Sequence, residues 1–152
     1  MTYVWYFAYG SNLDPNQMKK RVGSFQEARK ARLPGFKLVF RGYSKKWNGA
    51  VADIEPSEES IVYGVVYKIT EQQLRKLDGF EGYPRVYQRR PVEVITEKGD
   101  VISAVTYIRV KKEPQGIPSR EYLETIIKGL KAHGYPEELK DMVVKISKRN
   151  LK

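Results

Sequence analysis

The sequence predicts an α+β fold in which a mixed sheet curls toward a small β-barrel, with short helices and a helical C-terminal region. Three observations predict it. Segments rich in Val, Ile and aromatic residues recur through the first two thirds of the chain, two capped helical segments interrupt them, and helix-period apolar patterns fill the last third. The 152 residues contain no internal repeat or long linker, so we expect one domain over residues 1–152.

The chain opens with a strand and a short helix. Residues 3–8 are aromatic and apolar on both faces, as is typical of a strand covered from both sides. Asp14 is a suitable N-cap, Pro15 suits the first helical position, and Gln17 completes a capping box. These residues predict a helix that runs to Val22.

Basic strands are expected next, over residues 25–33 and 36–41, with Pro34-Gly35 as the turn between them. The acidic stretch 53–60 is expected to be a loop. Apolar residues occupy both faces of 61–69, so this segment is predicted to be a central strand.

A second short helix follows that strand. Thr70 caps it, Leu74 and Leu77 face inward, and Gly79 is expected to end it. A loop is expected over 79–85.

The strands 86–95 and 101–108 are predicted to pair as a hairpin through Lys98-Gly99-Asp100, with an edge or a bulge at Pro91.

Two helices are predicted in the last third of the chain. Ser119 caps the first, Gly134 ends it, and Pro136 opens the second. Their apolar stripes are Tyr122, Leu123, Ile126, Ile127 and Leu130 in the first and Leu139, Met142, Val143 and Ile146 in the second.

The composition excludes several kinds of chemistry. The absence of cysteine excludes disulfides, thiolate catalysis and zinc–sulfur sites, and the single histidine, His133, excludes histidine clusters and argues against a Ser-His-Asp triad. We therefore expect no metal and no cofactor, and we assign His133 no role. The longest apolar run, 3–9, is too short to span a membrane and lacks the flanks of a signal peptide, so we expect a cytoplasmic protein with no membrane partner.

The formal net charge of +10 is concentrated in one window. Residues 19–46 carry ten basic side chains against one acid, Glu27, which amounts to +9. Such a window fits a solvated sheet face, a surface for a polyanion, or a field that steers an acidic substrate. Interleaved apolar residues favour the solvated face, so nucleic acid is not the favoured partner but is not excluded. No motif indicates an oligomeric state.

The segment Tyr9-Gly10-Ser11-Asn12-Leu13 lies between the first strand and the first helix. Gly10 is free to take a positive φ, small side chains let a ligand approach the backbone, and a helix N-terminus follows. These features suit a cradle for a carboxylate or an oxyanion. An ordinary tight turn has the same composition.

Glu81 lies between two glycines and is flanked by aromatic residues. A carboxyl group in apolar surroundings has a raised pKa, which makes it a usable base and acid near neutral pH. A solvated loop acid is the alternative. Asp78 is interpreted as a brace at the end of the second helix.

Further short motifs accompany these two segments in a fixed order along the chain. The complete series is Tyr9–Leu13, Trp47 with Gly49 and Ala50, Val62–Tyr67, Leu77-Asp78 with Glu81-Gly82, Tyr87, Tyr107, Pro118–Tyr122 and Gly134–Pro136. In this order the sequence resembles the gamma-glutamylcyclotransferase family, including gamma-glutamylamine cyclotransferase-like proteins, over nearly its whole length. Leu139 departs from the pattern, because many close relatives have Tyr there.

The resemblance implies a cofactor-independent, cyclising acyl transfer. The α-amine of a small gamma-glutamyl amide attacks its own γ-carbonyl, which releases 5-oxoproline and an amine or amino acid. Glu81 is implied to be the general base and then the general acid. The implied substrate-binding residues are Tyr9, Gly10, Ser11, Asn12, Leu13, Tyr87, Tyr107 and Tyr122.

Other functions stay open from the sequence alone. The chain could be a small basic β-rich module that binds nucleic acid through residues 19–46, with Tyr43 and Trp47 as stacking platforms. It could also be a nonenzymatic binder on the same fold. Within the family, the substrate could be a gamma-glutamyl amino acid, a gamma-glutamyl amine or a larger protected intermediate.

Overall fold

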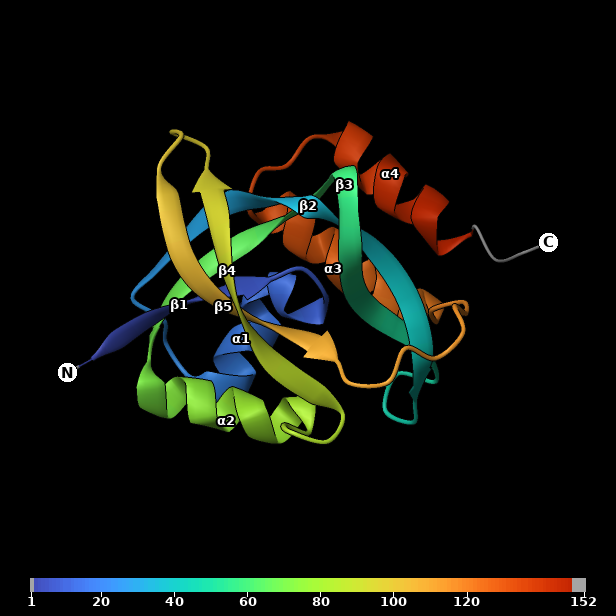
Figure 1. The fold of residues 1–152 in the computed structure, drawn as a ribbon, viewed down its shortest axis with the longest axis horizontal. Helices are drawn as coiled ribbons and strands as arrows, with labels where there is room; N and C mark the ends of the chain where they lie inside the picture. Colours follow the sequence, from blue (N-terminus) through green and yellow to red (C-terminus); the bar gives the residue numbers. More distant parts are fainter. Residues whose placement is uncertain (1, 149–152) are drawn as a thin grey trace.

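Strands form a closed barrel in the computed structural model, which describes residues 2–148 (Figure 1). The barrel order is β1–β3–β2–β4–β5. β1 and β5 run parallel, and the other neighbouring pairs are antiparallel. The strand bounds are β1 Tyr3–Ala8, β2 Glu27–Ser44, β3 Gly49–Thr70, β4 Tyr87–Thr96 and β5 Val101–Arg109.

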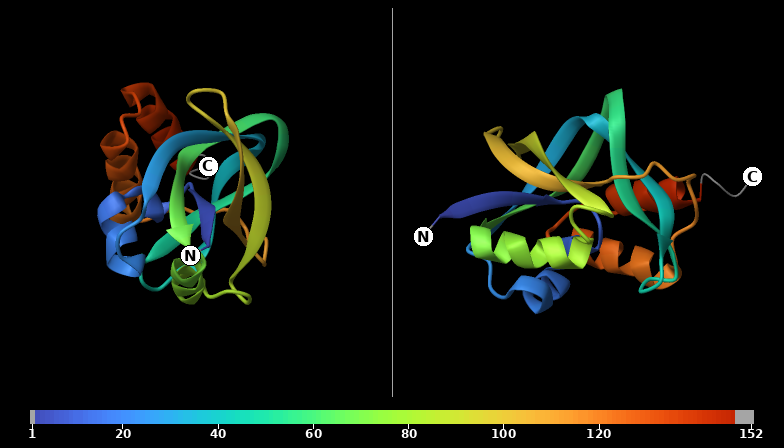
Figure 2. Two further views of the ribbon diagram at one scale, coloured as in Figure 1. Left: turned by 90° about the vertical axis from the view of Figure 1, so that its left-hand side faces the viewer. Right: turned by 60° about the horizontal axis from the view of Figure 1, so that its bottom comes forward.

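Helices cover the barrel from two directions (Figure 2). α3 and α4 pack together along one side, and α1 packs against α2 below the barrel. No helix within residues 2–148 combines the length and apolar character needed to cross a bilayer. The helix bounds are Ser11–Leu13 for the 3-10 turn η1, then α1 Pro15–Val22, α2 Glu71–Glu81, α3 Arg120–Ala132 and α4 Glu137–Ser147. The predicted α+β fold with a sheet closed into a small barrel is therefore confirmed.

The longest two strands correct two predictions. The turn expected at Pro34-Gly35 is instead a register shift within the continuous strand β2, where Gly35 has a φ of 85°. The loop expected over 53–60 lies within β3. Two of the acids that suggested a loop, Asp53 and Glu55, form ion pairs with basic residues of β2 across the β2–β3 ladder; Lys37 Nζ, for example, lies 3.5 Å from a Glu55 carboxylate oxygen. A long pair of strands can therefore include charged residues that, judged from a short stretch of sequence, suggest a loop.

Most of the observed helix boundaries agree with those predicted from the sequence. Thr70 and Gln73 form the predicted capping box, and the Ser119 hydroxyl accepts a hydrogen bond from the Tyr122 amide. α2 does not end at Gly79 but continues to Glu81, because Gly82 is the residue that takes the left-handed conformation, with a φ of 66°.

The predicted capping box at the first helix is wrong. Asp14 does cap α1, because its carboxylate accepts from the Asn16 amide at 3.0 Å. The Gln17 side chain instead donates to Ser11 Oγ at 2.6 Å and to Asn12 Oδ1 at 3.2 Å. Gln17 therefore supports the preceding loop rather than the helix end.

The hairpin of β4 and β5 forms as predicted, with Gly99 at a φ of 91°. Pro91 pairs with Val105 of β5, whereas β4 meets β2 only through Ile95 and Thr96. Pro91 thus lies on an edge-like part of β4, where its missing N–H costs no ladder bond.

Candidate functional site

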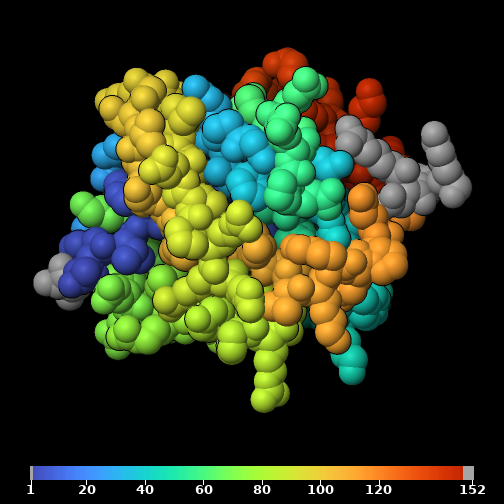
Figure 3. Space-filling model, viewed as in Figure 1, coloured from blue at the N-terminus to red at the C-terminus, as the bar shows by residue number. Residues whose placement is uncertain are grey.

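A cavity of about 300 Å³ lies at one end of the barrel, a size that suits a small ligand. The end of α2, the loop before α1, the turn after β2 and the barrel strands all contribute to its wall. In Figure 3 the segment after α2 (yellow-green) borders the segment after β5 (orange), and these segments are joined by a hydrogen bond from the Val110 amide to the Val86 carbonyl, 2.9 Å long.

The cavity brings together eight of the nine residues that the sequence singled out: Tyr9, Gly10, Ser11, Asn12, Glu81, Tyr87, Tyr107 and Tyr122. The ninth, Leu13, does not line it. Its side chain is buried in the hydrophobic core, so this residue can contribute through its backbone alone.

Glu81 is the last residue of α2 and is partly exposed where it lines the cavity. Within residues 2–148 its carboxylate makes no hydrogen bond or ion pair. Burial raises the pKa of Glu81 to about 7, although the positive charges of Arg21, Arg109 and Lys46 oppose this rise. The carboxyl group is therefore poised to exchange a proton near neutral pH.

The loop before α1 presents free backbone donors. The amides of Leu13 and Asp14 bond to the carbonyls of Gly10 and Ser11, at 3.0 and 3.1 Å. By contrast, the amides of Gly10, Ser11 and Asn12 donate no hydrogen bond in the part of the chain that the structure describes. Free amides at the start of a helix suit an anion.

Gly10 is required for space rather than for a positive φ. Its φ is −112°, so the loop does not use the positive φ that a glycine allows. A Cβ at this position would lie 3.1 Å from Tyr122 Oη and 3.4 Å from the Ala52 Cβ. The glycine lets the loop approach the tyrosine and strand β3 closely.

Several elements fix this loop in place. The Tyr67 hydroxyl donates to the Asn12 carbonyl at 2.8 Å, and Asn12 Nδ2 donates to Tyr6 Oη at 3.1 Å. α3 packs directly behind the loop, because a Cβ on Gly129 would lie 2.3 Å from the Leu13 carbonyl carbon.

His133, to which the sequence assigned no role, caps α3 and also supports the loop. Its Nε2 lies 3.1 Å from the Leu13 carbonyl oxygen. Burial lowers the pKa of His133. Nε2 is the donor in this contact, because a carbonyl oxygen can only accept.

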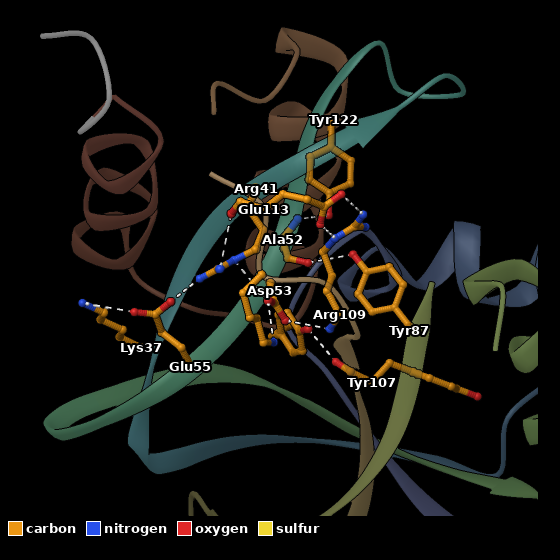
Figure 4. Close-up of polar contacts among 12 residues, drawn as sticks. Lys37, Arg41, Ala52, Asp53, Glu55, Tyr87, Tyr107, Arg109, Glu113 and Tyr122 are labelled. Atoms are coloured by element: carbon orange, nitrogen blue, oxygen red, sulfur yellow. Dashed lines mark hydrogen bonds and ion pairs between the residues drawn. The ribbon is translucent and has the colours of Figure 1, made fainter. Parts of the chain in front are cut away.

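The site tyrosines are held by backbone groups (Figure 4). The Tyr87 hydroxyl donates to the Ala52 carbonyl, and Tyr122 Oη accepts from the Ala52 amide, both at 2.8 Å. The Tyr9 hydroxyl donates to the Tyr107 carbonyl at 2.6 Å. Burial raises the pKa of each of these tyrosines, so they stay neutral.

Asp78 braces the end of α2, as interpreted from the sequence. Its carboxylate accepts from the Tyr107 hydroxyl at 2.6 Å and from two nitrogens of Arg89, at 3.0 and 2.6 Å. These contacts tie α2 to β4 and β5 and so fix the position of Glu81.

Sequence reasoning missed three basic residues that line the cavity: Arg21, Lys46 and Arg109. Arg109 is held by Glu113 through two hydrogen bonds of 3.1 and 3.0 Å and lies over the Tyr87 ring, 5.1 Å from its centroid. Arg21 and Lys46 belong to the basic window, residues 19–46. The excess of positive charge in this window was the sequence feature that could have indicated them.

The rest of the basic window is dispersed. Arg41 is buried, whereas Arg29, Lys30 and Lys37 form ion pairs with acids. Trp47, which the alternative of a nucleic-acid-binding module would use as a stacking platform, packs edge-on against Tyr122 with ring centroids 5.1 Å apart.

A buried ion network supports the wall of the cavity (Figure 4). The fully buried Asp53 carboxylate lies 3.2 Å from Arg41 and 3.0 Å from Lys112, and it accepts from the Arg109 amide at 3.0 Å. Arg41 also pairs with Glu55.

Replacing Asp53 by alanine is expected to lower the free energy of unfolding by about 3–5 kcal/mol, because the buried Arg41 would lose one of its two acidic partners and the Arg109 amide would lose its acceptor. Urea unfolding measures this loss. Asp141→Ala, at an exposed position on α4, is the control and should change stability by less than about 0.5 kcal/mol. Equal stabilities for the two variants would show that the network is not stabilising.

Within residues 2–148, no group of three or more Asp, Glu or His side chains is arranged to hold a metal ion. The residues that line the cavity offer one unpaired carboxylate, free amides, tyrosine hydroxyls and basic side chains.

Comparison with known proteins identifies similar chains. Residues 6–124 match the family model "Gamma-glutamyl cyclotransferase, AIG2-like". The sequence is 33% identical to gamma-glutamylcyclotransferase of Mus musculus, over 97% of this chain and 80% of that protein, and 36% identical to gamma-glutamylcyclotransferase of Homo sapiens, over 90% and 74%. A solved gamma-glutamyl cyclotransferase structure is similar with a TM-score of 0.86 and 32% identity, over 94% of this chain and 87% of that one.

Proposed function

Because the chain belongs to the gamma-glutamyl cyclotransferase, AIG2-like family, we propose that it cyclises a small gamma-glutamyl amide and releases 5-oxoproline together with an amine or amino acid. The observation that carries this proposal is the unpaired carboxylate of Glu81 in one cavity with the free amides of Gly10, Ser11 and Asn12. A base and an anion cradle are what this reaction requires.

The first step is removal of a proton from the substrate's α-amine. A free α-amine has a pKa of about 7.7–8.0 and is mostly protonated at neutral pH. Glu81 takes one proton, and the amine nitrogen then bonds to the γ-carbonyl carbon of the same molecule. Nucleophile and electrophile are already tethered, so a bound pose that brings them together recovers much of the entropic cost.

The second step is collapse of the tetrahedral intermediate. Its oxyanion is stabilised by amides of the loop before α1, as donors in other oxyanion holes stabilise theirs. The protonated Glu81 gives its proton to the leaving nitrogen, the original amide C–N bond breaks, and Glu81 returns to its ionised form. The ring nitrogen then gives up its remaining extra proton to Glu81, which passes it to the released amine. The products are a neutral lactam and an ammonium group, so one carboxyl group serves both transfers and the protons balance.

Ser11 is a binding residue in this mechanism and not a nucleophile. Its Oγ accepts a hydrogen bond from Gln17 Nε2 at 2.6 Å, and no histidine lines the cavity to activate it. The direct test of the proposed function is 5-oxoproline release from gamma-glutamyl amino acids, gamma-glutamyl-lysine and simple gamma-glutamyl amines. Absence of release from the whole panel would contradict the proposal.

The pH profile of kcat/KM tests the state of the base. We expect a rising limb near pH 7, because Glu81 acts as the carboxylate and its pKa is raised to about 7. The pH midpoint of this limb should stay the same when a second substrate, whose α-amine has a different pKa, is used. A limb near pH 4.5, the ordinary value for a glutamate, would show that burial does not tune this group.

A further inference from the structure

Gln17 lies behind the wall of the cavity rather than in it. The residue belongs to α1, is half-buried and does not line the cavity. Its side chain reaches two residues that do, because Nε2 donates to Ser11 Oγ at 2.6 Å and to Asn12 Oδ1 at 3.2 Å. Both hydrogens of one amide nitrogen are therefore used on the loop before α1.

The direction of these two hydrogen bonds is fixed by Arg21, one turn further along α1. A guanidinium carries donors only, and Arg21 Nη1 lies 3.4 Å from the side-chain oxygen of Asn12. Asn12 therefore turns Oδ1 toward α1 and Nδ2 toward Tyr6 Oη, which is 3.1 Å away. An amide oxygen accepts but cannot donate, so Gln17 has to meet Asn12 Oδ1 with its nitrogen. The same nitrogen then meets Ser11.

This direction decides what the Ser11 hydroxyl can do. A hydroxyl carries one proton, and the Ser11 oxygen accepts from Gln17, so that proton is not used on the α1 side. Within residues 2–148 the Ser11 hydroxyl donates no hydrogen bond. Ser11 is buried and lines the cavity beside the free amides of the loop. A buried donor without an acceptor costs free energy, and an anionic oxygen in the cavity removes that cost.

We propose, on the basis of the proposed function, that Gln17 is a positioning residue: by donating to Ser11 Oγ, it directs the Ser11 proton to a negatively charged oxygen of the bound substrate. The hydroxyl then acts on that oxygen together with the amides of Gly10, Ser11 and Asn12. Gln17 works through Ser11 and touches no reacting atom. A glutamine that only packed against the loop would not have to donate.

Reversal of the hydrogen bond tests this role. Gln17→Glu replaces the donor by a carboxylate, which only accepts, so the Ser11 proton is drawn toward α1 and away from the substrate. We expect kcat/KM for 5-oxoproline release to fall at least about tenfold, because a hydrogen bond to a charged group is worth this much. The helix tolerates the change, because a carboxylate one turn before Arg21 stabilises a helix.

Two further variants isolate the direction of the hydrogen bond. Gln17→Lys supplies a group that only donates, so it should keep kcat/KM within about threefold of the wild-type value. Asn16→Asp is the matched control for the added charge. It makes the same amide-to-carboxylate change at the neighbouring residue of α1, which is exposed and does not line the cavity. It should change kcat/KM by about twofold or less.

Ser11→Ala shows whether Gln17 acts through the hydroxyl. This variant should itself lower kcat/KM at least about tenfold, because the donor is lost. Gln17→Glu added to Ser11→Ala should lower kcat/KM by only about twofold more, because the proton that it would redirect is gone. Equal kcat/KM values for Gln17→Glu and Gln17→Lys would overturn the inference. A tenfold loss from Gln17→Glu that persists in the Ser11→Ala background would also overturn it.

Ligand binding separates this inference from the proposed function. Calorimetry with gamma-glutamyl-alanine in the Glu81→Gln background, which should not deplete the ligand, gives a dissociation constant for each Gln17 variant. Turnover by the wild-type protein without the expected order among the variants would uphold the reaction and overturn the inference. The expected order in binding without any release of 5-oxoproline would uphold the inference and overturn the reaction. Absence of both binding and release would overturn both.

Discussion

Glu81→Gln is expected to lower kcat for 5-oxoproline release by about a thousandfold or more. Glutamine keeps the shape of the side chain but can neither take the proton from the α-amine nor return it to the leaving nitrogen. General base and general acid assistance are each worth about 10²–10⁴-fold. Initial rates at pH 8, where the wild-type carboxylate is mostly ionised, measure the loss.

Glu71→Gln is the control for this substitution. Glu71 lies in the first turn of the same helix, α2, and is exposed, so the variant makes the same chemical change far from the cavity. It should retain wild-type kcat. A Glu81→Gln protein that keeps a tenth or more of the activity would remove Glu81 as the base, and the free amides would then need a different proton acceptor.

Gly129→Ala is expected to impair both stability and catalysis. The added Cβ would lie 2.3 Å from the Leu13 carbonyl carbon and 2.5 Å from the Asp14 amide nitrogen, so backbone rather than a flexible side chain has to move. α3 must shift away from the loop that carries the free amides. We expect a loss of about 3 kcal/mol or more in the free energy of unfolding, from overpacking, and a kcat/KM at least about a hundredfold lower.

Gly79→Ala is the matched control for Gly129→Ala. Gly79 also lies inside a helix, α2, but a Cβ there meets nothing within 4 Å. Alanine should therefore stabilise the protein by about 0.5–1 kcal/mol, through helix propensity and a less flexible unfolded chain. If urea unfolding gave the same result for both glycine variants, α3 would not be packed against the loop as tightly as the distances indicate.

The sequence predicted the parts of the fold that depend on local signals. Thr70, Ser119 and Gly134 mark helix ends through hydrogen bonds or backbone conformations that involve only neighbouring residues, and the structure confirms them. The β2–β3 ladder was misread because its charged residues are satisfied by partners on the other strand, such as Lys37 for Glu55. Such a pairing has no signature within a short window of sequence.

The candidate site likewise contains residues that the local sequence could predict and residues that it could not. Glu81 and the loop before α1 stand out in the sequence because glycines and aromatics surround them, and both line the cavity. Arg21, Lys46 and Arg109 were not singled out, since a basic residue on a strand or helix looks the same whether it faces solvent or a cavity. The packing of α1, of the turn between β2 and β3 and of the end of β5 around the cavity brings these three residues to its wall.

The parallel contact between β1 and β5 closes the barrel through residues far apart in sequence, Tyr6 and Val105. The same closure carries Tyr9 to the carbonyl of Tyr107. Contacts of such long range form slowly, because a large loop has to be ordered before they contribute any stability. We therefore expect the cavity, whose wall includes both Tyr9 and Tyr107, to be complete only once β1 and β5 have paired.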